Sequence, residues 1–302
     1  ASSLPPTRPR GSPKGRVEMR LSIDHKTGFR YSTKVKSSYN EARMTPVATT
    51  TQAVWGSRVS ITPTAWSFSY ADYWGTAVTA FEVHEPHDRL TVQAQAVVET
   101  RGDDITWDTD RRVAGNDLGW PALRDRGVID PLTEFLTVNE RTQAPEEVAE
   151  LARQTSDQPP RLAALDICRL IADGLSYARG STAVNAKAVD VWAGAKGVCQ
   201  DYSHLALGAL RSVGLPARYV SGYLHPGGDA MPNTLVEGES HSWIEWWCGS
   251  WVAYDPTLQS RVSESHVRVG HGRDYGDVAP LRGTYSGGPS EMFVTVQMTQ
   301  LG

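Results

Sequence analysis

Cysteine is scarce in this chain of 302 residues, which contains Cys168, Cys199 and Cys248 and no others. So small and odd a number in a long chain does not form a disulfide framework. No two of the three have the C-x-x-C spacing of a zinc site or of a thioredoxin-type redox motif. We therefore predict no metal and no cofactor, and we expect free thiols in a reducing, cytoplasmic setting.

Long apolar runs and an excess of basic charge are also missing. No stretch reaches the roughly 18–20 apolar residues that cross a bilayer, so we predict no membrane partner. The net charge of −4 and the pI of about 6.1, without a stripe of Lys and Arg, argue against a nucleic-acid binder. The opening residues ASSLPPTRPRGSPKG lack the apolar segment of a secretory signal, and we interpret residues 1–18 as a disordered tail or an expression leader.

What remains has the composition of a globular protein, and its length suggests two domains. Residues 19–100 contain short β-branched and aromatic stretches separated by Gly, Pro and Asp, which predicts an antiparallel β-sandwich-like domain. Within it, residues 26–28 are expected to form a turn. Residues 101–140 are expected to be a connector. In residues 141–302 helical patterns are followed by strand patterns, including the final MFVTVQM, which predicts an α+β domain.

The segment KGVCQDYSHLALGALRSVGLP carries the clearest chemical signal. Apolar residues recur at helical spacing from Tyr202 to Val213, and Gly214 fits the left-handed position that ends a helix. We therefore expect a helix that begins at or just after Cys199. A thiol there has a lowered pKa because the helix N-terminus stabilises the thiolate, and the same N–H groups can bind an oxyanion. On this motif alone, a small buried hydrophobe is an equally good interpretation of Cys199.

The segment HSWIEWWCGSWVAYDP predicts two strands joined at residues 248–250. A three-residue loop places Trp247 opposite Trp251 and makes His241 and Asp255 diagonal neighbours on one face. A two-residue loop would place Asp255 on the opposite face. Given the odd loop or a bulge, His241 is the candidate base for Cys199, and Asp255 is the candidate group that orients the imidazole.

The other cysteines and histidines have weaker claims. Cys168 lies within an apolar helical pattern and is expected in the core, and Cys248 lies in a turn. His204, one helical turn after Cys199, is expected to cap or support. Surface or local hydrogen-bonding roles are expected for the remaining histidines, His25, His84, His87, His225, His266 and His271.

The order GVCQDYSHL, HSWIE, WVAYDPT resembles the transglutaminase-like cysteine enzymes of the papain-like fold, and most closely the bacterial members with an extra N-terminal β domain. SYNEARMTP and FEVHEPHDRLTV resemble the N-terminal module of that family. VGHGRDYGDVAPLRGTYSGG resembles its C-terminal signature, whose Tyr275 and Asp277 we expect to support the site structurally. The resemblance spans roughly residues 19–298, and it implies an α+β chain in which a β-sandwich-like domain precedes a papain-like transglutaminase core.

The resemblance also implies roles for single residues. Cys199 matches the nucleophile, His241 the base and Asp255 the third member of the triad. The backbone N–H of Cys199 would then help to bind the oxyanion. Ala193 stands where papain relatives have a Gln, which leaves the second oxyanion donor open. The indole N–H of Trp192 is one candidate, although packing in a wall is the commoner role for such a ring.

The function implied by the resemblance is cysteine-dependent acyl transfer through a thioester. The acyl donor would be a Gln carboxamide or a peptide or isopeptide bond of a protein or peptide substrate, and the outcome transamidation or hydrolysis. Two alternatives stay open: a cysteine peptidase or amidase only, and a non-catalytic binding scaffold with a vestigial site. Tryptophans that could wall a water-excluding channel, with core packing as the default for each, are Trp192, Trp243, Trp246, Trp247 and Trp251.

Overall fold

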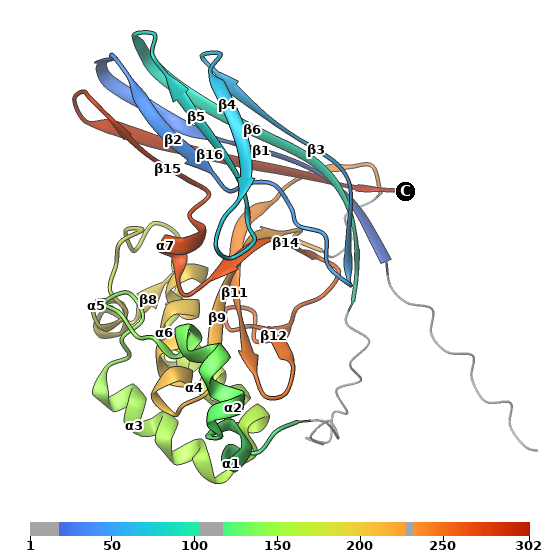
Figure 1. The fold of residues 1–302 in the computed structure, drawn as a ribbon, viewed down its shortest axis with the longest axis vertical. Coiled ribbons are helices and arrows are strands. Elements are labelled where there is room, and N and C mark those ends of the chain that lie inside the picture. Colours follow the sequence, from blue (N-terminus) through green and yellow to red (C-terminus); the bar gives the residue numbers. More distant parts are fainter. Residues whose placement is uncertain (1–17, 103–116, 228–231) are drawn as a thin grey trace, which may run out of the picture.

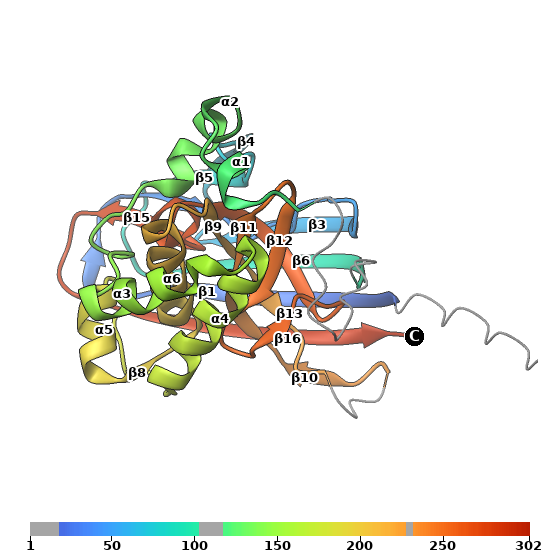
Figure 2. The ribbon, with the colours of Figure 1, turned by 90° about the horizontal axis from the view of Figure 1, so that it is seen from below.

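The computed structural model describes residues 18–102, 117–227 and 232–302. The expected tail, up to residue 17, and residues 103–116 of the expected connector lie outside the described residues. Two packed sheets form one end of the molecule, a third sheet lies in the middle, and helices cover the far side of that third sheet (Figures 1 and 2). Within the described ranges, no helix is both long and apolar enough to cross a membrane.

The N-terminal half forms two antiparallel sheets that bury one shared core, as the sequence predicted. Alternate residues of its inner strand β6 (His87–Arg101), such as Leu90 and Val92, are fully buried, whereas their neighbours are more exposed. The five-stranded sheet has the order β10 (Leu235–Glu237), β16 (Ser290–Leu301), β1 (Glu18–Val35), β6 (His87–Arg101), β3 (Gln52–Thr62), and the four-stranded sheet the order β15 (Leu281–Tyr285), β2 (Ser38–Ala42), β5 (Ala77–Val83), β4 (Trp66–Ala71).

Gly28 lies inside a strand, so the interpretation of residues 26–28 as a turn is wrong. Strand β1 runs unbroken from Glu18 to Val35, and Gly28 pairs with Thr91 of β6. A Cβ at residue 28 would lie 1.9 Å from the carbonyl oxygen of Leu90. The glycine is therefore required by the close approach of two backbones.

The end of the chain returns to the N-terminal sheets. Strand β16 pairs with β1 from Arg20↔Leu301 to Tyr31↔Ser290, and β15 pairs with β2. The MFVTVQM strand was expected among the strands of the second domain, but its partner lies at the other end of the sequence. Such long-range pairing leaves no mark in a local pattern. The domain boundary near residue 140 stays a prediction.

The second half of the chain surrounds a five-stranded antiparallel sheet, as expected for an α+β arrangement. Its order is β13 (Ser260–Arg261), β12 (Trp251–Asp255), β11 (Glu239–Trp247), β9 (Ala217–Leu224), β14 (His266–Gly272). Helix α6 (Cys199–Ser212) packs on β9 and β11, and further helices pack on α6: α3 (Glu146–Gln154), α4 (Pro160–Gly174) and α5 (Ala188–Gly194). The remaining short elements are α1 (Trp120–Leu123), α2 (Arg126–Ile129), η1 (Asp130–Leu136), η2 (Thr155–Asp157), α7 (Tyr275–Val278), and the parallel pair β7 (Ser176–Tyr177) and β8 (Lys196–Gly197).

Helix α6 begins and ends where the sequence predicted. It starts at Cys199, and Gly214, just beyond its end, has a φ of 82°. The helix is buried on all sides, however, because other helices cover the side that faces away from the sheet. Polar residues of α6 are therefore buried together with the apolar face: Gln200, Asp201, Ser203, His204 and Arg211.

Gly208 is where α6 touches the backbone that enters α3. A Cβ at this position would lie 1.8 Å from the carbonyl oxygen of Thr142. We expect Gly208→Ala to lower the free energy of unfolding by about 1–3 kcal/mol, because overpacking outweighs the gain of about 1 kcal/mol in helix propensity. Urea denaturation measures the change. Gly194→Ala at the end of α5 is the matched control, since its Cβ would meet nothing within 4 Å. Equal stability of Gly208→Ala and wild type would contradict the packing described here.

Candidate active site

Cys199 is the first residue of helix α6, and the segment before it is held in place by Asp201. The Asp201 carboxylate accepts the backbone N–H of Val198 at 2.8 Å and the hydroxyl of Thr182 at 2.6 Å. Gly197 permits this approach, because a Cβ there would lie 2.8 Å from the Cβ of Asp201. The thiol thus lies at a fixed helix N-terminus, where the first backbone N–H groups have no partner within the helix.

The three thiols of the chain differ in environment. Cys199 is partly exposed, whereas Cys168 and Cys248 are buried and all three are free. Burial raises the pKa of Cys168, as it does that of Cys248, to about 12 for the latter. Burial also acts to raise the pKa of Cys199, but hydrogen bonds and charge from His241 and hydrogen bonds from Ser242 outweigh it and lower the pKa. Cys199 is therefore the thiol best suited to form a thiolate.

The hairpin of β11 and β12 has the predicted register. Trp247 pairs with Trp251 across the three-residue loop 248–250, in which Gly249 has a φ of 103°. This odd loop length places His241 and Asp255 on the same side of the sheet. The Nε2 of His241 lies 2.6 Å from Oδ2 of Asp255. The predicted contact between the imidazole and the carboxylate is confirmed.

His241 also couples to the thiol. Its Nε2 is occupied by Asp255, and its Nδ1 is buried without a hydrogen-bond partner, so Nδ1 is the ring nitrogen left to interact with Cys199. Burial lowers the pKa of His241, but its hydrogen bonds to Asp255 and to the Cys199 thiolate raise it to about 10. A lowered thiol pKa beside a raised imidazole pKa favours a thiolate–imidazolium pair at neutral pH.

Helix α6 and strand β11 are joined beside this pair. The hydroxyls of Ser203 on α6 and Ser242 on β11 lie 3.2 Å apart. Ser242 also hydrogen-bonds the thiol of Cys199. The packing of α6 on the sheet thus fixes the thiol relative to His241. The sequence analysis did not identify Ser242. The sequence feature that could have pointed to it is its position directly after His241 on the strand.

His266 also belongs to this cluster, which the sequence did not suggest. Surface or local hydrogen bonding was expected for it. The local hydrogen bond is present, from the backbone N–H of Ser263 to Nδ1 at 3.2 Å, but the residue is only 5% exposed and its Nε2 also lies 3.2 Å from Oδ2 of Asp255. His241, Asp255 and His266 are, in the described part of the chain, the one group of three side chains whose metal-ligating atoms lie within 4.8 Å of one another. The separations of 2.6 and 3.2 Å from Oδ2 to the two ring nitrogens are hydrogen-bond lengths.

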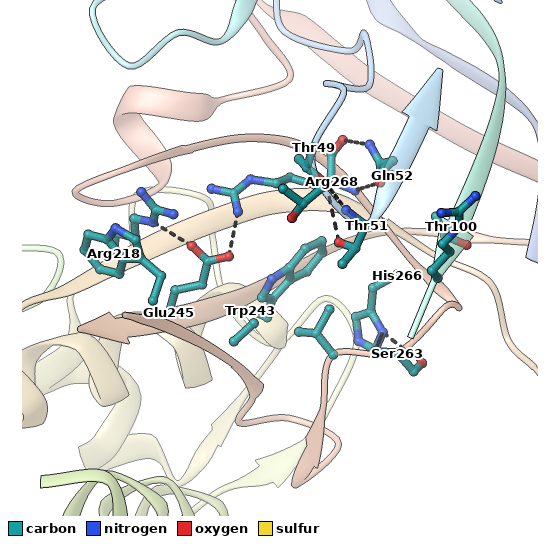
Figure 3. Close-up of a pocket in the computed structure, with 15 residues that line it drawn as sticks. Thr49, Thr51, Gln52, Thr100, Arg218, Trp243, Glu245, Ser263, His266 and Arg268 are labelled. Carbon is teal, nitrogen blue, oxygen red and sulfur yellow. Dashed lines mark hydrogen bonds and ion pairs between the residues drawn. The ribbon is translucent and has the colours of Figure 1, made fainter. Parts of the chain in front are cut away.

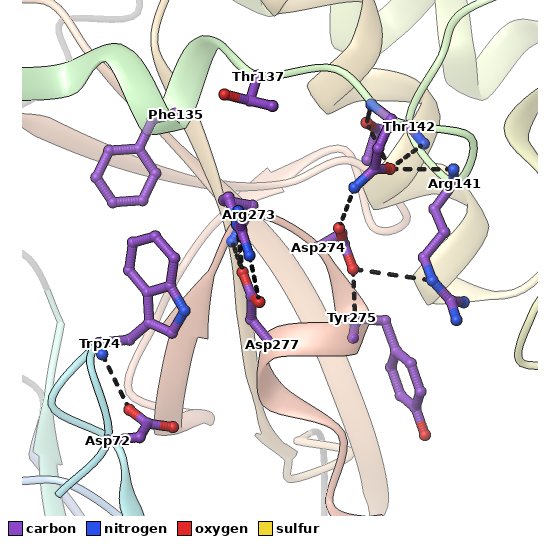
Figure 4. A network of polar contacts seen from close by, with 12 residues as sticks. Asp72, Trp74, Phe135, Thr137, Arg141, Thr142, Arg273, Asp274, Tyr275 and Asp277 are labelled. Carbon is purple, nitrogen blue, oxygen red and sulfur yellow. Dashed lines mark hydrogen bonds and ion pairs between the residues drawn. The ribbon is translucent and has the colours of Figure 1, made fainter.

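Tyr275 and Asp277, expected to support the site, lie in a polar network beside α7 (Figure 4). The backbone N–H of Tyr275 donates to Nε2 of His204 at 3.1 Å, and Asp277 accepts Nε of Arg273 at 2.9 Å. Burial lowers the pKa of His204 to about 3, so this ring is a neutral acceptor. His204 therefore joins α6 to α7, which agrees with the supporting role expected for it.

None of the five candidate tryptophans lines the pocket that opens beside His241. Trp243 and Trp246 are buried in the protein interior, and the ring of Trp251 stacks beneath the guanidinium of Arg218 at 3.9 Å. The indole N–H of Trp192 donates to Glu147 on α3. Trp192 is thus engaged elsewhere and is not an oxyanion donor in this structure.

A pocket of about 370 Å³ opens beside His241. Most of its wall is apolar, and carboxylates lie at its edge. The guanidinium of Arg179 pairs with one of these carboxylates, Glu239. The lining residues are Tyr177, Leu224, Pro226, Glu237, Glu239, His241, Thr257 and Leu258.

A second, polar cavity of about 190 Å³ lies between the N-terminal sheet and the middle sheet (Figure 3). There Glu245 accepts hydrogen bonds from Arg218 and from Arg268, each at 2.6 Å. Burial acts to raise the pKa of Glu245, but the two guanidinium groups lower it. The ion pairs of Glu245 thus line this cavity, and of the two cavities the pocket beside His241 is the one lined by a member of the thiol–imidazole pair.

Comparison with known protein families gives two matches along the chain. Residues 21–99 match the bacterial transglutaminase-like N-terminal region, and residues 149–256 match the transglutaminase-like superfamily. The second match contains Cys199, His241 and Asp255. The first match covers the strands of the N-terminal sheets up to β6.

Individual relatives span different shares of the chain. An uncharacterized protein of Mycobacterium leprae, ML0607, is 42% identical over 93% of this chain and 99% of its own length. A protein-glutamine gamma-glutamyltransferase of Pseudomonas aeruginosa is 30% identical over 46% of this chain and 22% of its own length. The crystal structure of a candidate cysteine protease of Cytophaga hutchinsonii superposes with a TM-score of 0.73 at 21% identity, covering 95% of this chain and 92% of that one.

Proposed function

Since the chain belongs to the transglutaminase-like superfamily, among the bacterial members that carry the N-terminal region, we propose that it transfers acyl groups through a thioester on Cys199. The observation that carries this proposal is the alignment of three groups: a thiol at a helix N-terminus, the imidazole of His241 and the carboxylate of Asp255. A protein that only binds a partner has no need for a thiol, an imidazole and a carboxylate in this arrangement, which argues against the vestigial-site alternative.

The first half-reaction forms the thioester. The Cys199 thiolate attacks the carbonyl carbon of a Gln carboxamide, or of a peptide or isopeptide bond, and the oxyanion is stabilised by the backbone N–H of Cys199. The carbon–nitrogen bond then breaks as the His241 imidazolium gives its proton to the departing nitrogen. Ammonia or an amine leaves, and His241 is left neutral.

The second half-reaction releases the acyl group. An amine or a water molecule attacks the thioester carbonyl and gives a proton to neutral His241, and the Cys199 thiolate departs. The imidazolium–thiolate pair is thereby restored. An amine gives transamidation and water gives hydrolysis, so the same triad serves both outcomes.

The pocket beside His241 supports an amine as acceptor. His241 exchanges a proton with both the leaving and the entering nitrogen, so both must pass through the space next to its ring. Leu224, Pro226 and Leu258 make that space apolar, which disfavours water and suits an aliphatic stem. Glu237 at the edge is placed to attract a cationic group. We therefore expect amines to compete with water for the thioester.

We also propose a protein or peptide as the acyl donor and a reducing compartment, the cytoplasm, as the setting. The free state of all three cysteines supports the second proposal.

Incubation of the protein with dimethylcasein and monodansylcadaverine tests the function. We expect the fluorescent amine to be incorporated at Gln side chains with release of ammonia, in wild type and not in Cys199→Ala. Mass spectrometry in ¹⁸O-water separates this outcome from the others. Cys199-dependent conversion of Gln to Glu would support thioester hydrolysis, and new peptide termini would support the peptidase alternative. Equal product yields with wild type and Cys199→Ala would overturn the proposal.

A further inference from the structure

Asp255 is fully buried and is hydrogen-bonded at both carboxylate oxygens. Its Oδ1 accepts the backbone N–H groups of Thr257 at 2.8 Å and Leu258 at 3.0 Å. Its Oδ2 lies 2.6 Å from Nε2 of His241 and 3.2 Å from Nε2 of His266. A carboxylate has about four acceptor directions, so His266 takes the last of them.

The second ring nitrogen of His266 shows which tautomer is present. Nδ1 lies 3.2 Å from the backbone nitrogen of Ser263, whose N–H can only donate. The hydroxyl of Ser263, 3.3 Å from Nδ1, can donate to it as well. Nδ1 therefore acts as an acceptor without a proton, and the neutral ring carries its proton on Nε2. A doubly protonated ring would aim an N–H at another N–H. His266 is thus a neutral donor to Asp255.

The ring of His266 is also held from the side. The edge of Trp243 packs against it, with ring centroids 5.3 Å apart and an angle of 84° between the rings. Gly222 on β9 makes room for this tryptophan, since a Cβ there would lie 2.7 Å from the indole. His266 at the start of β14 therefore presents its Nε2–H to Asp255 in one orientation.

We propose that His266 is a positioning residue that shares Oδ2 of Asp255 with His241 and so limits how tightly Asp255 holds the imidazolium. This inference rests on the proposed function, in which His241 must give its proton to a departing nitrogen. Two N–H donors divide the charge of one oxygen. Without His266 that charge would fall on His241 alone, and the imidazolium would release its proton less readily.

Replacement of His266 leaves the other titratable and charged residues near His241 in the sequence. They are Cys199 on α6, Asp255 on β12, Tyr177 on β7, Glu237 on β10 and Glu239 on β11, which pairs with Arg179. A shift in the titration of His241 on replacement of His266 therefore reports on the shared oxygen.

Two substitutions distinguish the effect of the Nε2–H donor of His266 from the effect of its ring. His266→Phe keeps the ring against Trp243 and removes the N–H, whereas His266→Gln offers an amide N–H close to the position of Nε2. We expect kcat for amine incorporation to fall by about 10- to 100-fold in His266→Phe with little change in KM, as for other residues that orient a catalytic group. We expect the alkaline limb of the pH–rate profile to move up by about half to one unit in this variant. His266→Gln is expected to stay close to wild type in both.

The alkylation of Cys199 by iodoacetamide across the same pH range gives a readout that needs no substrate. An alkaline limb of alkylation that shifts in His266→Phe and is restored in His266→Gln supports the proposal. Equal loss of rate in both variants, or a slower His266→Phe with an unshifted limb, would reduce His266 to a structural support and overturn it. If wild-type Cys199 itself titrates as an ordinary thiol, the proposed function fails instead.

Nitrogen-15 NMR of the histidine rings keeps the inference testable even if His266→Phe does not fold. In the wild-type protein, we expect the ring of His266 to carry its proton on Nε2 and none on Nδ1. A doubly protonated ring, or a proton on Nδ1, would overturn the proposal.

Discussion

Replacement of Cys199 by alanine is expected to lower acyl transfer by about 10⁶-fold, because removal of a nucleophile also silences the residues that act with it. Steady-state incorporation of a fluorescent amine measures the loss. The fold should survive, since the side chain is small and lies at the partly exposed end of helix α6. Thermal unfolding of the variant checks this point.

The chain offers matched controls for this substitution. Cys168→Ala and Cys248→Ala make the same chemical change at buried thiols whose pKa burial raises. We expect both variants to retain turnover close to that of wild type. If a control variant loses activity while Cys199→Ala keeps it, the nucleophile has been assigned to the wrong residue.

Asp255→Asn is expected to slow acyl transfer by about 10⁴-fold while the fold is retained, by the same loss of imidazole orientation that is known for catalytic triads. The structure gives a specific reason. All four hydrogen bonds at Asp255 run from N–H groups to the carboxylate. An asparagine must therefore turn its own NH₂ group toward two of these donors. Either His241 changes tautomer or the loop that begins at Thr257 shifts.

The pH dependence of the reaction distinguishes these effects from general damage. The hydrogen bond to Asp255 is one of the causes that raise the pKa of His241 to about 10, so its loss should move the alkaline limb to lower pH. This shift is opposite in sign to the one expected for His266→Phe. Asp24→Asn on the N-terminal sheet is the matched control for the acid-to-amide change and should leave turnover unaltered. Near-normal activity of Asp255→Asn would mean that another residue orients His241.

The features that the sequence predicted correctly depend on neighbours along the chain. The start of helix α6 at Cys199 follows from the apolar spacing and from Gly214 beyond its end, both of which are local. The shared side of His241 and Asp255 follows from the parity of a three-residue loop. Each pattern is compatible with few structures, so His241 and Asp255, fourteen positions apart, could be placed together by counting alone.

The features that the sequence missed depend on which strands become neighbours in a sheet. His266 reaches Asp255 because β14 joins the sheet beside β9, and no local pattern sets that order. Strand β16 pairs with β1 for the same kind of reason. Gly28 was assigned to a turn because glycine often marks one, whereas here it allows β1 to approach the backbone at Leu90.

The central claim is that His241 holds Cys199 as a thiolate ready to attack a carbonyl carbon. The pH dependence of alkylation in the wild-type protein tests it most directly, with iodoacetamide as the reagent and peptide mapping to resolve Cys199, Cys168 and Cys248. We predict that Cys199 reacts rapidly and at a nearly constant rate across neutral pH, while the two buried thiols react slowly. A rate at Cys199 that rises tenfold per unit toward the ordinary thiol pKa of about 8.5 would contradict the account.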